Sequence, residues 1–94
     1  MEWRDRDRMR RNYTLLLDSI DPDVMCTHLL EAGLLSRGMV EMVRATPGGR
    51  YSRSEELLMM LMRRGPRAFD TFLSCLRRAK QDALVAALLQ DASI

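Results

Sequence analysis

Aromatic residues are scarce in this 94-residue sequence, which has one Trp, two Tyr and two Phe. Leu, Met, Val and Ala must therefore fill any core, and the abundance of strong helix formers over β-branched residues favours helices. No apolar run approaches the roughly 18 residues of a membrane-spanning helix. The N-terminal stretch MEWRDRDRMRR has no apolar signal region. These features predict one soluble, cytoplasmic, all-helical domain.

Residues that carry catalysis or bind metals are also few. His28 is the only His, and Cys26 lies two residues before it, so on a helix the two side chains diverge. The two Cys and one His lack the spacing of a zinc site, and the stretch TPGGR lacks the spacing of a phosphate-binding loop. We therefore predict that the chain is not an enzyme and holds no metal or cofactor. Cys26 and Cys75 are expected to be reduced and buried.

The first half of the chain contains three expected helices. Residues 2–19 show apolar residues at helical spacing. A second helix is predicted to begin at Asp21, a good N-cap, with Pro22 in the first helical position. Gly33 is expected to stop that helix, and Ser36 to cap a short third one.

The second half of the chain contains three more expected helices, after a break at TPGG. Ser52, with Glu three residues later, has the pattern of a capping box and predicts the start of the fourth helix. Gly65 is expected to end that helix in a left-handed conformation, and Pro66 to open the fifth with its φ already set. The sixth is predicted over residues 81–90. Six short helices with short loops predict a compact antiparallel bundle.

The predicted core follows the apolar stripe of each expected helix, which is clearest in the fifth. It consists of Leu16, Leu17, Leu29, Leu30, Val43, Leu58, Leu61, Phe69, Phe72, Leu73, Leu76, Leu84 and Leu88. Met59, Met60 and Met62 interleave with leucines, and we interpret them as core residues rather than as an adaptable binding surface.

Charge is unevenly distributed although the net charge is only +2. Counting Lys and Arg against Asp and Glu gives +2 for residues 1–11, −4 for residues 12–43 and +6 for residues 44–80. A small bundle with an acidic and a basic face is complementary to its own kind. Because the two faces differ, such a contact joins copies head to tail rather than symmetrically.

The basic clusters also leave open an alternative of another class, a helical nucleic-acid-binding domain that contacts phosphates. Aromatic residues that could stack on bases are few, and the acidic middle segment would repel nucleic acid. Nucleic acid is therefore the less favoured partner.

Four stretches resemble the caspase recruitment domain, or CARD, a branch of the death-domain superfamily. RRGPRAFDTFLSCL, residues 63–76, resembles the junction of its fourth and fifth helices, with the pattern Arg-Gly-Pro-x-Ala-Phe. HLLEAGLLS at 28–36, MRRNYTLLLDSI at 9–20 and KQDALVAALL at 80–89 resemble its second-to-third junction, first helix and last helix. The resemblance implies that residues 1–91 form a six-helix antiparallel Greek-key bundle whose first helix is kinked. Residues 92–94 would then form a C-terminal tail.

The resemblance also implies a homotypic interaction module. In such modules a basic surface on the first and fourth helices of one domain meets an acidic surface on the second and third helices of another. The basic residues here would be Arg10, Arg11, Arg53, Arg63 and Arg64, and the acidic residues Asp23, Glu31 and Glu41. Tyr13 departs from the pattern, since a basic residue is expected there.

Within the family, the nearest likenesses are the prodomains of initiator caspases, which are recruited to oligomeric activation platforms in apoptosis, and the CARD of the adaptor RAIDD. The ending RRAKQDALVAALL favours the caspase, whose cysteine protease region would follow in the full-length protein. The expected partner is another CARD-containing protein, such as an adaptor, a scaffold or a caspase, with self-association as a further possibility. No membrane partner is expected.

Overall fold

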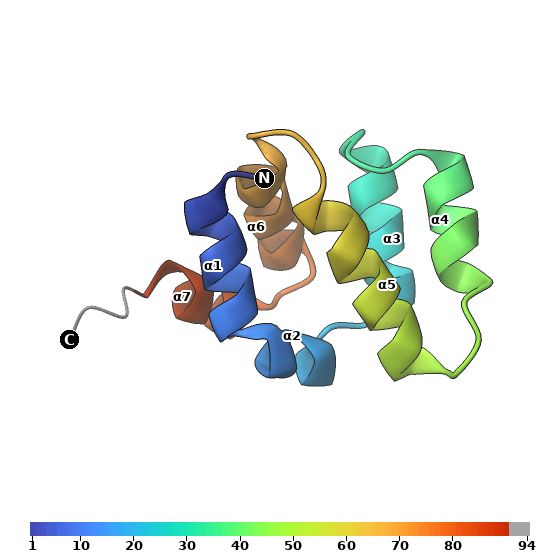
Figure 1. Cartoon of the computed structure of the whole chain (residues 1–94), viewed down its shortest axis with the longest axis horizontal. Coiled ribbons are helices and arrows are strands. Elements are labelled where there is room, and N and C mark those ends of the chain that lie inside the picture. Colours follow the sequence, from blue (N-terminus) through green and yellow to red (C-terminus); the bar gives the residue numbers. More distant parts are fainter. Residues whose placement is uncertain (91–94) are drawn as a thin grey trace.

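The computed structural model describes residues 1–90, which form seven α-helices and no strand (Figure 1). The helices are α1 (Trp3–Arg11), α2 (Tyr13–Ser19), α3 (Pro22–Glu31), α4 (Arg37–Arg44), α5 (Arg50–Met62), α6 (Ala68–Arg78) and α7 (Asp82–Leu89). The predicted all-α class is confirmed. The count exceeds six because the expected first helix is divided into α1 and α2. The predicted tail, 92–94, lies outside the described residues.

The break between α1 and α2 occurs at Asn12. Its side-chain amide donates to the carbonyl of Arg8 at 2.9 Å, the acceptor that a regular helix would reserve for the Asn12 backbone. The Asn12 backbone N–H bonds instead to the carbonyl of Met9. Side-chain competition for a backbone acceptor thus accounts for the expected kink in physical terms.

The predicted ends of the second and third helices are correct. Asp21 accepts hydrogen bonds from the backbone of Asp23 and Val24 at the start of α3, and Ser36 accepts from Met39 at the start of α4. At the other end of α3, Gly33 has a φ of 77°. Each of these ends depends on hydrogen bonds within a few residues, which explains why local sequence predicts them.

Two expected helix starts are wrong. The helix α5 begins at Arg50, so Ser52 lies inside its first turn and forms no capping box. The reason is Gly49, which takes the N-cap position with a φ of 86°, so the helix begins three residues earlier than a Ser52 cap would allow. Gly65 does not adopt a positive φ, and Pro66 precedes α6 rather than opening it.

The Gly-Pro pair instead forms a β-turn. The Ala68 N–H donates to the Gly65 carbonyl at 3.0 Å, which places Pro66 in the second position of the turn. Proline favours this position because its φ is already close to the value that a type I turn needs. The helix α6 then begins at Ala68, directly after the turn.

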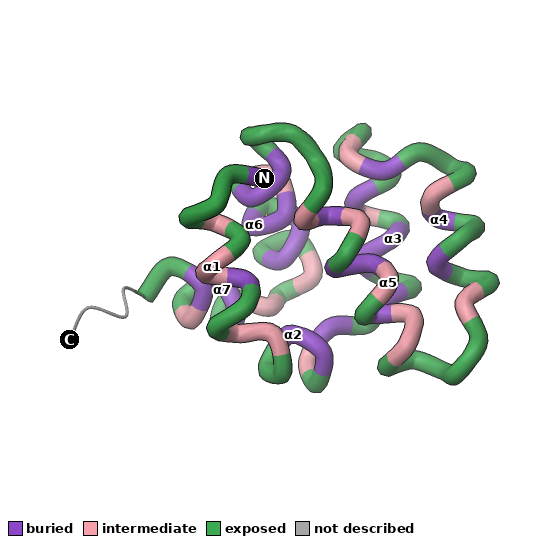
Figure 2. The backbone as a smooth tube through the Cα atoms, viewed as in Figure 1, coloured by how far each residue is buried: buried purple, intermediate pink, exposed green. Residues whose placement is uncertain are grey.

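The core lies on the inner faces of the helices (Figure 2). All predicted core residues are buried except Leu30, which is 36% exposed. The prediction for Leu30 is wrong because the buried stripe of α3 runs through Met25, Cys26 and Leu29. A residue one position after Leu29 is rotated by about 100° around the helix and faces outward.

The packing of the helices separates the two ends of the molecule. The helix α3 packs against α4, α5 and α6, while α1 packs against α7. The described bundle measures 40 × 25 × 24 Å, and α1 and α4 lie toward opposite ends of the long axis (Figure 1). A surface on α1 and a surface on α4 therefore lie toward opposite ends of the molecule.

Candidate interaction surfaces

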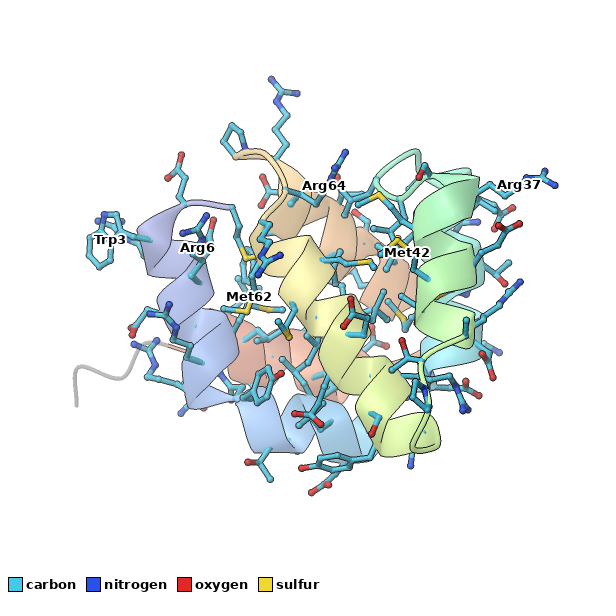
Figure 3. The ribbon with its side chains drawn as sticks, turned by 45° about the vertical axis from the view of Figure 1, so that its right-hand side comes forward. Trp3, Arg6, Arg37, Met42, Met62 and Arg64 are labelled. Carbon is cyan, nitrogen blue, oxygen red and sulfur yellow. The ribbon has the colours of Figure 1, made fainter. Side chains whose placement is uncertain are left out.

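A groove runs between α1 and α5, lined by Arg6, Arg10, Met59, Met62 and Arg63. Tyr13 extends it toward α2, where Arg10 and Met62 also line the surface. We call these six residues the α1–α5 groove. Figure 3 shows Arg6 and Met62 in the space between the α1 and α5 ribbons. The lining combines three arginines with apolar side chains and contains no carboxylate.

Backbone contacts hold the two walls of the groove together. The Nε atom of Arg6 donates to the Met62 carbonyl at 2.9 Å. The N-terminal ammonium of Met1 donates to the carbonyl of Arg64. The Met62 carbonyl is in the last turn of α5, where helical carbonyls have no partner within the helix, and the Arg64 carbonyl lies two residues further along the chain. The start of the chain therefore caps α5 and fixes the position of α1 beside it.

The three methionines of α5 lie outside the core. Met59 is 46% exposed, and Met60 and Met62 are half-buried at the margin of the core. The prediction that Met59 fills the core is wrong, because the buried stripe of α5 consists of Leu57, Leu58 and Leu61 together with Ser54. Met59 and Met62 instead form the apolar part of the groove, a role that the alternation with leucine concealed.

The structure divides the five predicted basic residues into two groups. Arg10 and Arg63 line the groove, and within residues 1–90 neither forms an ion pair. Arg64 is exposed just beyond the end of α5. Arg11, in contrast, pairs with Asp7 on its own helix, and Arg53 pairs with Asp23 of α3 at 3.8 Å.

The pairing of Arg53 with Asp23 brings a predicted basic residue against a predicted acidic one in the same molecule. The expected surfaces therefore meet where α5 and α3 pack together. Arg6, which the sequence analysis did not select, lines the groove together with Arg10 and Arg63. Its position four residues before Arg10 on a helix was the available signal.

The predicted acidic residues also differ in their surroundings. Glu31 lies 3.4 Å from Arg78 of α6 and 3.8 Å from His28, which is partly buried as expected. Glu41 of α4 is exposed and forms no ion pair within the described part of the chain. Its neighbour Met42 is 60% exposed. Glu41 is therefore the predicted acidic residue most available to a partner.

Burial favours the neutral, protonated forms of one phenol and two thiols. Burial raises the pKa of the Tyr13 phenol above its ordinary value, and the nearby charge of Glu55 adds to the effect. Burial likewise raises the pKa of the Cys26 and Cys75 thiols. A protonated, buried thiol is a poor nucleophile.

Residues 1–90 have neither a cluster of metal ligands nor a membrane-spanning helix. They contain no group of three or more His, Cys, Asp or Glu side chains that could hold a metal ion. No helix in the same range is long and apolar enough to cross a membrane. What the described surface offers is a charged, partly apolar groove on one side and an exposed carboxylate, that of Glu41, on another, which are features of a protein-binding domain.

Comparison with known proteins identifies the domain. The profile of the CARD family, the caspase recruitment domain, matches residues 6–91. The chain therefore belongs to this family, as the resemblance predicted, and its helices form a death-fold bundle. A CARD is an interaction module rather than a catalytic domain, so the prediction that this chain is not an enzyme is confirmed.

A curated relative carries the likeness further. The chain is 30% identical over 88 residues to Caspase-2 of Gallus gallus, an alignment that includes 94% of this chain and 20% of the relative. The chain thus spans about a fifth of the length of that protein.

Proposed function

We propose that this CARD is the prodomain of an initiator caspase and recruits it, through homotypic CARD–CARD binding in the cytoplasm, to an oligomeric platform in apoptosis. The likeness to Caspase-2 supports attachment to a caspase over an adaptor of the RAIDD type. The proposed domain covers residues 1–91, and the protease region follows it in the full-length protein. Assembly raises the effective concentration of the attached protease regions until they dimerise.

The binding surfaces in this proposal consist of the residues that the family resemblance predicts. The groove and the ion pairs within the chain indicate which of these residues are most available to a partner. Arg10 and Arg63 of the groove form the centre of the basic surface, with Arg64 beside them and with Arg11 and Arg53 at its margin. Glu41 leads the acidic surface, with Asp23 and Glu31 already neutralised in part by Arg53 and Arg78. Complementary surfaces of this kind set partner choice and encounter rate.

One observation carries the proposal, namely that Arg10 and Arg63 line the same groove without a carboxylate to neutralise them. Like charges held close together repel each other, and a partner carboxylate placed between them removes that repulsion. Ion pairs elsewhere on the surface, such as that of Arg11 with Asp7, are already satisfied and offer less to a partner.

The test is the binding of Arg10→Glu/Arg63→Glu to the CARD of a RAIDD-type adaptor, measured by isothermal titration calorimetry. We expect at least about a hundredfold loss of affinity, because two charges of the interface are reversed. The control variant Arg77→Glu/Lys80→Glu has the same change in charge on the last turn of α6 and the residue after Ala79, and it should bind normally. Both variants must keep the helical circular dichroism spectrum.

Unchanged binding of the groove variant would refute the assignment of the basic surface. A titration of the wild-type chain with unrelated DNA and RNA addresses the other class of partner. Binding with a steep dependence on salt would favour nucleic acid instead.

A further inference from the structure

The arginines of the α1–α5 groove carry more charge than a single carboxylate neutralises. Arg6, Arg10 and Arg63 line one hollow of about 240 Å³, and within residues 1–90 none of them forms an ion pair. Arg6 donates to the Met62 carbonyl through its Nε atom, which leaves its terminal nitrogens for a ligand. Three guanidinium groups around one hollow match a ligand with several negative charges held close together.

Linked phosphates meet this requirement better than carboxylates do. A guanidinium group presents its N–H donors in a planar fork that binds phosphate oxygens in pairs. A chain of phosphates carries negative charge on every group, so one small ligand neutralises all three arginines. Binding then removes the repulsion that these arginines exert on each other.

The end of the groove at Tyr13 has a different chemistry. Tyr13 lines a second hollow of about 360 Å³, which shares Arg10 and Met62 with the first. Burial and the nearby negative charge of Glu55 raise the pKa of the Tyr13 phenol, so negative charge is already present at this end. A phosphate is disfavoured there, whereas an uncharged flat ring packs well on the Tyr13 ring and on the thioether of Met62.

The two hollows form one continuous groove between α1 and α5, where Figure 3 shows Arg6 and Met62. Together they reach the size of small-molecule sites, which measure about 300–1,000 Å³. The groove therefore has a cationic end and an aromatic end. A ligand that fits both carries several phosphates on one side and an uncharged ring on the other.

We propose that the α1–α5 groove binds a nucleoside triphosphate. Its phosphates lie among the three arginines, and its base lies against Tyr13 and Met62. This site goes beyond the proposed function, because its ligand is not a second CARD. One consequence rests on that function: the bound triphosphate occupies the arginines that the partner CARD needs, so the two ligands compete.

The first test titrates the wild-type chain with ATP and with inorganic tripolyphosphate by isothermal titration calorimetry in buffer without Mg²⁺. Both probes contain the triphosphate, and only ATP contains the nucleoside. We expect ATP to bind at least about fivefold more tightly, which is the lower end of what one stacked base contributes. Equal affinities would overturn the nucleoside as part of the ligand, and binding of neither probe would overturn the site.

Charge variants locate the phosphates. Arg10→Gln/Arg63→Gln should weaken the binding of both probes by at least about tenfold, since two charge-assisted contacts to phosphate are lost. The control Arg77→Gln/Lys80→Gln removes the same charge at the end of α6 and just beyond it, and it should bind both probes as the wild type does. Equal losses in the two variants would show that overall charge, not the groove, attracts the phosphates.

Tyr13→Leu tests the contact with the base. It should lower the affinity for ATP to about that for tripolyphosphate, while tripolyphosphate binding stays unchanged and shows that the groove is intact. Tyr13→Phe keeps the ring and should bind ATP normally. If Tyr13→Leu loses its helical spectrum, Met62→Gln gives the same comparison on the other apolar wall. Wild-type ATP affinity in a folded variant would overturn the proposed arrangement.

Competition separates this inference from the proposed function. ATP should weaken the complex with the adaptor CARD more than NaCl of equal ionic strength does. If ATP binds in the groove but leaves the complex intact, the ligand site stands and the proposed basic surface is wrong. If ATP does not bind while Arg10→Glu/Arg63→Glu abolishes adaptor binding, the proposed function stands and the ligand site is wrong.

Discussion

The helices α3 and α6 end in the same hydrogen-bonded motif with different residues at its critical position. After α3, the N–H of Gly33 bonds to the carbonyl of Leu30 and that of Leu34 to Leu29. After α6, Lys80 bonds to Arg77 and Gln81 to Leu76 in the same pattern. This is the Schellman motif, which needs a left-handed residue after the helix. Gly33 has a φ of 77° and Lys80 a φ of 62°.

The two positions predict opposite effects of substitution. The left-handed conformation costs a residue with a Cβ about 1–2 kcal/mol. Removing a glycine offsets part of this by restricting the unfolded chain, by about 0.4–1 kcal/mol. A Cβ at Gly33 would meet no atom within 4 Å, so the backbone alone decides. Gly33→Ala should therefore destabilise the fold by about 1 kcal/mol, and Lys80→Gly should stabilise it by about 0.5 kcal/mol.

Urea denaturation measures both effects, provided that the slope of the transition does not change. Gly65→Ala is the matched control, because Gly65 also has open space around it but no positive φ. It should be neutral or slightly stabilising. Equal shifts for Gly33→Ala and Gly65→Ala would show that the left-handed conformation is not the cause, and a destabilising Lys80→Gly would refute the reasoning for α6.

Two further predictions concern the arginines of α5 and the two buried thiols. Arg50 donates to the carbonyls of Asp18 and Ile20 at 3.1 and 2.9 Å, so Arg50→Ala should lower the free energy of unfolding by about 1–2 kcal/mol. By comparison, Arg53→Ala should change it by less than about 0.5 kcal/mol, as measured by urea denaturation. Burial raises the pKa of both thiols in the folded chain above the ordinary value of 9.0. As the pH rises past 9.0, the thiols of the unfolded chain therefore ionise while those of the folded chain are still protonated. Stability should therefore fall as the pH rises above 9.0, and alkylation at pH 8 should be slow until denaturant is added; rapid alkylation of the folded chain would contradict this.

The features that the sequence predicted correctly depend on interactions between residues close together in the chain. The caps at Asp21 and Ser36 depend on hydrogen bonds that span two or three residues, and local sequence is sufficient to predict them. The fourth helix was expected to start at Ser52 because a capping box fits there. A left-handed Gly49 starts the helix earlier, and the φ of a glycine is not encoded by its own side chain.

The helical spacing of leucines predicted most of the core correctly, but it placed Leu30 and Met59 in the core wrongly. A stripe of leucines at helical spacing identifies a buried face, but the width of that face depends on which helices pack against it. Leu30 and Met59 are each one residue past a buried leucine, and both emerge at the surface. Residue type alone does not distinguish such an edge position from a core position.

For this chain, sequence alone determined the helical class, most of the core, the two N-caps and the membership of the CARD family, because each depends on local patterns or on an order of residues that resembles that of the family. Only the tertiary structure decided which charges are available. Arg53 and Asp23 are thirty residues apart in the chain yet neutralise each other, while Arg10 and Arg63, far more distant in sequence, line one groove. Charge in a sequence is a property of single residues, but a binding surface depends on which residues the packing of the helices brings together.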